Sequence, residues 1–147
     1  MRHKNPAPSD PVRPKGTERA VVAAALVSLL ALSACAPAGK EAAAAAEEFH
    51  QAVDAGQMSQ ACSLLQPTTR EETARTGGAG SCENQLQSKR LPNAGKILHT
   101  ERYGRNALVE FEKDTVFLTA SDAGWKITAA GCTPEGDAPY RCEVGGR

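Results

Sequence analysis

The stretch ALVEFEKDTVFLTASDAGWKITAA, residues 107–130, decides the fold. Apolar side chains recur at every second position in three short runs, which is the period of a half-buried β-strand. The connections between the runs are two and four residues long, so neighbouring strands form antiparallel hairpins. We therefore predict three consecutive strands: Ala107–Glu112, Thr115–Ala120 and Trp125–Ala130.

Two further strands are expected on either side of this stretch. Lys96–Tyr103 alternates in the same way and is joined to the next strand by a short turn. After Cys132 the chain contains glycine and prolines, and Tyr140–Val144 is expected to return as a short edge strand. The sheet thus has four or five antiparallel strands.

The residues before Pro92 have a helical pattern instead. Glu41–Ala55 is rich in alanine and is followed by Gly56, which favours a helix with a left-handed stop. We expect three shorter helices after it. The first has Ser59 as its cap and ends before Pro67, the second has a capping box of Thr68 or Thr69 with Glu71 or Glu72, and the third has Ser81 as its cap. Helices followed by an antiparallel sheet predict an α+β domain, with the N-terminal helices packed on a curved, cone-like sheet.

The amino-terminal segment has the parts of an export signal. Five basic residues precede Ala20–Ala34, an uncharged run of 15 residues that ends in small side chains. A helix needs about 20 apolar residues to span a bilayer, so the run suits a cleaved signal. The closing residues Leu32-Ser33-Ala34-Cys35 resemble the lipobox of bacterial lipoproteins. The resemblance implies that Cys35 receives a diacylglycerol and becomes the first mature residue.

Two alternatives to lipidation remain open. One is an ordinary signal peptide cut near Ala34, and the other is an uncleaved anchor. With lipidation, residues 1–34 are a removed signal peptide, residues 35–40 a lipid-anchored tether and residues 41–147 a single domain. The protein would then lie on the extracytoplasmic face of the cell membrane, held there by palmitate-type acyl chains.

The order of elements and the D-A-G-W-K-I hairpin at 122–127 resemble small actinobacterial lipoproteins of the nuclear-transport-factor-2-like, or cystatin-like, fold. The resemblance covers roughly residues 41–130. Some members of that fold are enzymes, such as steroid isomerases, with acids inside a cone. Their catalytic pattern does not map onto this chain, and a fold alone implies no activity.

The charge of the mature chain narrows the classes of partner. Without residues 1–34 the chain has 113 residues and a formal net charge of −3. A nucleic-acid partner calls for a basic face, so we expect none. We expect the lipid anchor to hold the protein at the membrane, with an envelope protein or a small apolar molecule as the partner of the domain.

Four cysteines remain beside Cys35, and an even number in an exported domain indicates disulfides. Three connectivities are open. We prefer Cys62–Cys82 and Cys132–Cys142, because each joins segments that are close in sequence and alike in predicted structure. The closely spaced cysteine pairs of a zinc or redox site are absent from the sequence, so we expect no metal and no cofactor.

No catalytic signature stands out among the remaining residues. His99 and Trp125 are the candidate pocket residues: His99 alternates on a strand toward a half-buried concavity, and Trp125 begins a hairpin strand. We expect His50 to be solvated on the first helix. Glu110, Glu112 and Asp114 offer carboxylates, but acid–base catalysis also needs a pocket that raises the pKa of one of them.

The sequence therefore favours a non-catalytic, lipid-anchored envelope lipoprotein that binds a partner protein or a small apolar ligand. One alternative is a small enzyme with a cone-shaped pocket that acts on a hydrophobic substrate through His99 or a nearby acid. Another is a structural envelope lipoprotein without a pocket.

Overall fold

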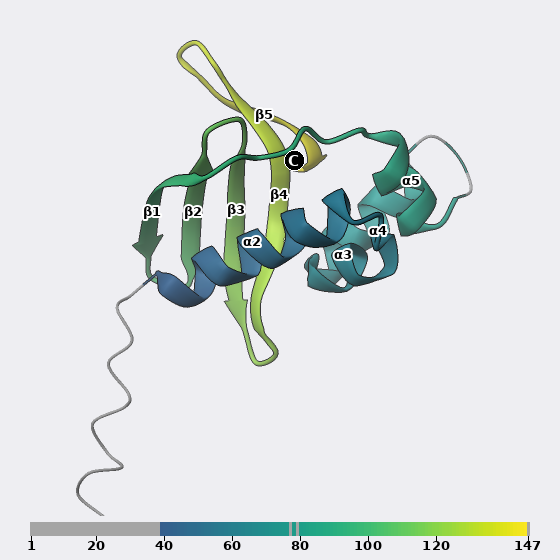
Figure 1. The fold of residues 1–147 in the computed structure, drawn as a ribbon, viewed down its shortest axis with the longest axis horizontal. Helices are drawn as coiled ribbons and strands as arrows, with labels where there is room; N and C mark the ends of the chain where they lie inside the picture. Colours follow the sequence, from purple (N-terminus) through teal and green to yellow (C-terminus); the bar gives the residue numbers. More distant parts are fainter. Residues whose placement is uncertain (1–38, 77, 79, 147) are drawn as a thin grey trace, which may run out of the picture. The chain divides into compact units, whose positions relative to one another are not determined.

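The structure is a computed structural model that describes residues 39–76, 78 and 80–146. They belong to one compact unit, Pro37–Arg147. The predicted signal peptide, Cys35 and tether residues 36–38 lie outside the described residues. Four helices come first, followed by five strands (Figure 1): α2 (Lys40–Asp54), α3 (Met58–Leu64), α4 (Pro67–Arg75), α5 (Cys82–Ser88), β1 (Ile97–Tyr103), β2 (Asn106–Phe111), β3 (Thr115–Ser121), β4 (Gly124–Glu135) and β5 (Ala138–Gly145).

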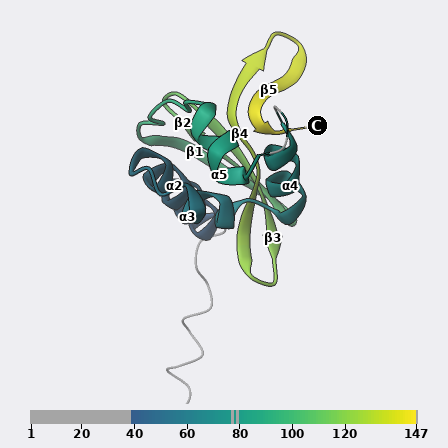
Figure 2. The same ribbon diagram turned by 90° about the vertical axis from the view of Figure 1, so that its right-hand side faces the viewer.

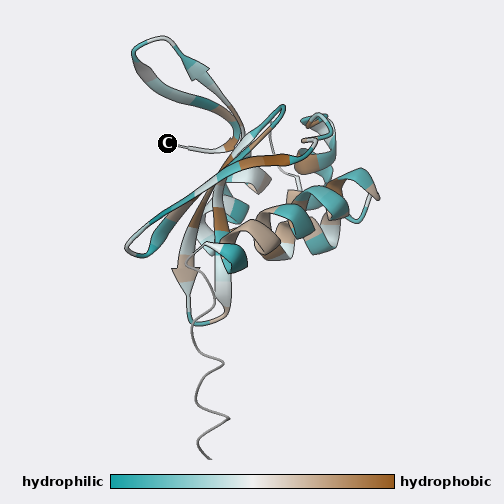
Figure 3. Cartoon of the chain, turned by 60° about the vertical axis from the view of Figure 1, so that its left-hand side comes forward, coloured by the Kyte–Doolittle hydropathy of each residue, from teal (hydrophilic) through white to brown (hydrophobic). Residues whose placement is uncertain are grey.

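The strands form one antiparallel sheet in the order β1-β2-β3-β4-β5, and this confirms the predicted α+β class. The helices gather on one side of the sheet (Figure 2). Between the two layers lies a core built on the fully buried side chains of Phe49, Leu86, Val109, Leu118 and Ile127. The β4–β5 hairpin projects beyond this core and is largely hydrophilic or neutral (Figure 3).

Strands β4 and β5 are longer than the sequence pattern predicts. The apolar alternation stops at Ala130, but β4 continues to Glu135. Gly131, with a φ of +65°, forms an irregular step within the strand and lets it continue. Glycine adopts this left-handed conformation without steric cost. The hairpin then runs on to Glu135 and returns through Tyr140–Val144, the predicted edge strand.

The helix starts differ from prediction at two places. Ser81 caps α5 as expected, since its Oγ accepts the Asn84 N–H at 3.3 Å. The predicted cap at Ser59 is wrong, because α3 begins at Met58 with Gln57 before it. The predicted capping box is also wrong, because Pro67 opens α4. Proline suits a first helical turn, where its missing N–H would have no intrahelical partner.

The loop before α4 is tied to the sheet. The Gln66 N–H donates to the Ile127 carbonyl at 2.8 Å, and Leu65 forms a parallel bridge with Ile127. This short contact covers β4 ahead of Ala129, the first β4 residue that pairs with β5. The α3–α4 linker therefore continues the sheet edge beyond β5.

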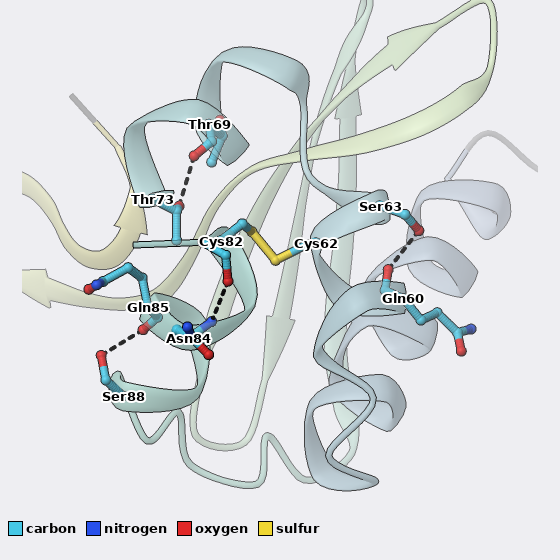
Figure 4. The surroundings of a disulfide bond; sticks show 10 residues. Gln60, Cys62, Ser63, Thr69, Thr73, Cys82, Asn84, Gln85 and Ser88 are labelled. Atoms are coloured by element: carbon cyan, nitrogen blue, oxygen red, sulfur yellow. Dashed lines mark hydrogen bonds between the residues drawn. A yellow bond between two sulfur atoms is a disulfide. The ribbon is translucent and has the colours of Figure 1, made fainter. Parts of the chain in front are cut away.

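Both preferred disulfides are confirmed. Cys62–Cys82 joins α3 to α5 across 20 residues, and Figure 4 shows it between the two helices. Cys132–Cys142 joins β4 to β5 at directly paired positions. The first bridge fixes the helical layer and the second fixes the projecting hairpin. Among the described helices, none is long and apolar enough to cross a bilayer.

Candidate functional site

Trp125 lines a cavity of about 590 Å³ between α2, the end of α3 and the β3–β4 hairpin. One wall is apolar. The indole, itself half-buried against the core, stands with five small or aliphatic side chains: Ala44, Ala45, Leu64, Ala120 and Ala123. Ligand pockets commonly have volumes of about 300–1,000 Å³ and mostly apolar walls, so this cavity could hold a small molecule.

Charged side chains of both signs stand around the same cavity, and contacts within the protein hold most of them. The Lys126 ammonium donates to the Ser63 carbonyl at 2.9 Å. Glu48 accepts the Gln60 amide at 3.0 Å. The Arg102 guanidinium lies 5.7 Å from the Trp125 ring centroid, within the range of a cation–π contact. The cavity thus combines one apolar wall with charged side chains that are mostly held by contacts within the protein.

A second feature, the contact between His50 and Asp114, lies in the interior. His50 Nε2 is 2.9 Å from Asp114 Oδ2, with 6% of the histidine side chain and none of the aspartate side chain exposed. The imidazole makes edge contacts with the rings of Phe49 and Phe111, at centroid distances of 5.4 and 4.9 Å. The prediction of a solvated His50 is wrong, because this face of α2 is turned to the sheet.

The contact is short without being a well-directed hydrogen bond, and within the described residues His50 Nδ1 has no partner. It forms an ion pair when the imidazole is protonated. Asp114 is better satisfied: its two oxygens accept the backbone N–H groups of Gly131 at 3.1 Å and Cys132 at 2.8 Å. A buried carboxylate needs such donors.

Asp114 therefore connects three parts of the domain. It holds the irregular step of β4 at Gly131, it fixes the backbone of Cys132 beside the second disulfide, and it contacts α2 through His50. Neither Asp114 nor His50 lines the Trp125 cavity. Since both side chains are almost wholly buried, we interpret the pair as a structural contact that holds α2 against the sheet.

The other sequence-predicted residues do not come together as a site. His99 is exposed instead of half-buried, because it lies on β1 at the margin of the sheet, on the face opposite the helices. Glu110, its partner on β2, is exposed, as is Glu112 beyond the end of that strand. These exposed carboxylates therefore do not form an enclosed site with His99.

One signal for the burial of His50 was present in the sequence. His50 lies four residues after Ala46 and eight after Ala42, both buried, and therefore shares their helix face. The partners of Asp114 were not accessible in this way, because they are 17 and 18 residues distant and meet it only across the sheet.

Comparison with protein-family models, with curated proteins and with solved structures finds no match. Within the part of the chain that the structure describes, no three histidine, cysteine, aspartate or glutamate side chains gather as a metal site.

Proposed function

We propose that this chain is a non-catalytic lipoprotein of the cell envelope, anchored on the extracytoplasmic face of the membrane through Cys35, and that its domain binds a small apolar ligand at Trp125. The observation that carries the proposal is the cavity of about 590 Å³ with one apolar wall. Its size suits a molecule of a few rings or a short acyl chain.

The proposed anchor is consistent with the position of this cavity. Glu41 lines the cavity and is the second residue of α2, so the cavity lies beside the point where the domain begins. The four residues between Cys35 and α2 could span at most about 14 Å, so an anchor at Cys35 would keep the cavity near the lipid headgroups. A molecule released from the bilayer would reach it over a short distance.

The sole tryptophan gives a direct assay, because its fluorescence reports the cavity alone. The probe is 1-anilinonaphthalene-8-sulfonate, whose rings suit the apolar wall and whose sulfonate suits Arg102 or Lys126. We expect saturable energy transfer from Trp125 to the bound probe in the mature chain. Unsaturable, weak transfer would contradict the proposal.

A matched pair of variants locates the bound probe. Ala44→Leu adds three carbons inside the cavity and should weaken probe binding about tenfold, which corresponds to about 1.4 kcal/mol. Ala55→Leu makes the same change at the exposed end of the same helix, outside the cavity, and should leave binding unchanged. Equal effects of the two changes would place the probe elsewhere.

A further inference from the structure

Exposed apolar side chains gather on β1, at one margin of the sheet. Leu98 is 62% exposed and Tyr103 46%, and they are the large hydrophobic residues left exposed among those described. In the described chain β1 pairs with β2 alone, so one side of β1 has no strand beside it (Figure 1). Such an edge offers unpaired N–H and C=O groups to another strand.

The opposite margin is better protected than β1, which has a register shift against β2 between Ile97 and His99 and pairs regularly from His99 to Tyr103. β5 contains Pro139, which cannot donate a backbone hydrogen bond, and α4 packs against β5. The free part of β4 is covered by the α3–α4 linker at Leu65. β1 has seven residues and no proline. Between the two margins, β1 is the one suited to accept a further strand.

The hydrogen bonding of β2 shows which β1 groups point outward. The Glu112 N–H donates to the Lys96 carbonyl, whereas the Phe111 N–H donates to the backbone carbonyl of Asp114, toward β3. Alternation along β2 therefore directs Glu110 and Leu108 to β1, where they pair with His99 and Glu101. The intervening Thr100 has its backbone N–H and C=O directed to the free side.

Charge selects the register in which a second β1 could pair. With two copies antiparallel and centred on Thr100, His99 of each lies opposite Glu101 of the other, where the imidazole N–H can donate to the carboxylate. Centring on Glu101 would instead place two carboxylates face to face, which is unfavourable for directly opposed residues. Of these two registers, the one centred on Thr100 is therefore favoured.

The start of the domain fits the same arrangement. Gly39 lies against Thr100: a Cβ built on this glycine would be 3.1 Å from Thr100 Cγ2. In a pair centred on Thr100 the two chains would therefore enter their domains side by side. If Cys35 is lipidated as proposed, both anchors can insert into one membrane, and the membrane raises the effective concentration of the pair.

We propose that β1 is a homodimerisation edge, which pairs antiparallel with β1 of a second copy about a two-fold axis at Thr100. The sheets of the two copies join, and the helices of both remain on one face. Leu98, at the register shift of β1, and Tyr103, at its last residue, then lie toward the two ends of the seam.

Disulfide trapping in the full chain tests the register. Two copies with different tags are exported together, one carrying His99→Cys and the other Glu101→Cys, and are oxidised with copper phenanthroline. Both positions are exposed, so neither change disturbs the core. The two positions face each other as a closely spaced pair, about 4.5 Å between Cα atoms, and this distance allows a disulfide.

We expect at least fivefold more cross-linked heterodimer from the mixed pair than cross-linked homodimer from either variant expressed alone. The control pairs His99→Cys with Asp122→Cys, which is exposed at the tip of the β3–β4 hairpin, and should give only background. Cross-linking of the mixed pair no stronger than this control would overturn the proposal.

Charge rescue is the second measurement. This measurement uses two differently tagged chains that carry only the native cysteines. His99→Glu places a carboxylate opposite Glu101 of the other copy and should reduce their co-purification severalfold. Adding Glu101→Lys restores opposite charges across the seam and should restore co-purification. A loss without rescue would mean that residue 99 matters for another reason, and the register would be wrong.

Discussion

Replacing Asp114 with alanine tests the structural role of this buried carboxylate most directly. The side chain is fully buried and accepts two backbone N–H groups, at 3.1 and 2.8 Å, while also contacting His50 at 2.9 Å. Alanine leaves both N–H groups buried without an acceptor, at about 1–3 kcal/mol each. For the two groups together we therefore expect a loss of about 2–6 kcal/mol in the free energy of unfolding.

Two further variants separate the parts of this loss. Asp114→Asn keeps one oxygen for Gly131 or Cys132 and should lose about half as much as Asp114→Ala. His50→Phe keeps an aromatic ring between Phe49 and Phe111 and leaves both backbone bonds of Asp114 in place. It should cost less than Asp114→Asn, because no backbone donor loses its acceptor.

Urea unfolding of the oxidised domain, followed by circular dichroism, measures these differences. A domain of this size has a free energy of unfolding of about 5–15 kcal/mol. The expected loss should therefore lower the urea concentration at the midpoint of unfolding substantially. A loss below about 1 kcal/mol in Asp114→Ala would show that water replaces the carboxylate freely. The assignment of Asp114 as the link between α2, Gly131 and Cys132 would then fail.

The remaining predictions concern the anchor, a disulfide and a helix cap. Cys35→Ser should release the chain from the membrane fraction or leave an uncleaved precursor; an unchanged mature membrane form would refute lipidation. Replacing both Cys62 and Cys82 with serine should lower the free energy of unfolding by about 3 kcal/mol, measured in urea, because 20 residues separate the two cysteines and the unfolded chain gains that freedom. The backbone N–H of Glu83 and then the Ser81 hydroxyl hold the pKa of the Glu83 carboxyl below 4.5. Its contribution to stability is therefore present above about pH 4.5 and is lost as the pH falls through the lowered pKa, so Glu83→Gln should destabilise the domain at pH 7 and progressively less in more acidic solution.

The elements that could be predicted are those set by local pattern. The alternation in residues 107–130 determined three strands because side chains on a half-buried strand must repeat with period two. Ser81 was recognised as a cap because a hydroxyl beside the first turn of a helix finds a free N–H there. Both disulfides could be predicted because the two cysteines of each bridge are close in sequence, so only a short segment separates the positions that the bridge joins.

The elements that could not be predicted depend on contacts between distant segments. Ser59 and the two threonines before Glu71 have the chemistry of caps, yet α3 already begins at Met58. α4 begins at Pro67, whose ring fixes φ, directly after Gln66 bonds to the sheet at Ile127. The extension of β4 past Gly131 needs an acceptor for its N–H, and that acceptor is the side chain of Asp114. No residue close in sequence to Gly131 indicates that Asp114 contacts it, and no residue close to Asp114 indicates Gly131.

The same distinction bears on function. His99 was a candidate base because it alternates on a strand, but alternation defines two faces and does not say which face is covered. In this sheet the helices cover the other face, so His99 is left in solvent with Glu101 and Glu110. An exposed histidine between acids on an edge strand is poorly placed for general-base catalysis, which needs a pocket that orients a substrate. It is well placed to recognise a complementary strand, and for this reason the residue that first suggested an enzyme supports an interface instead.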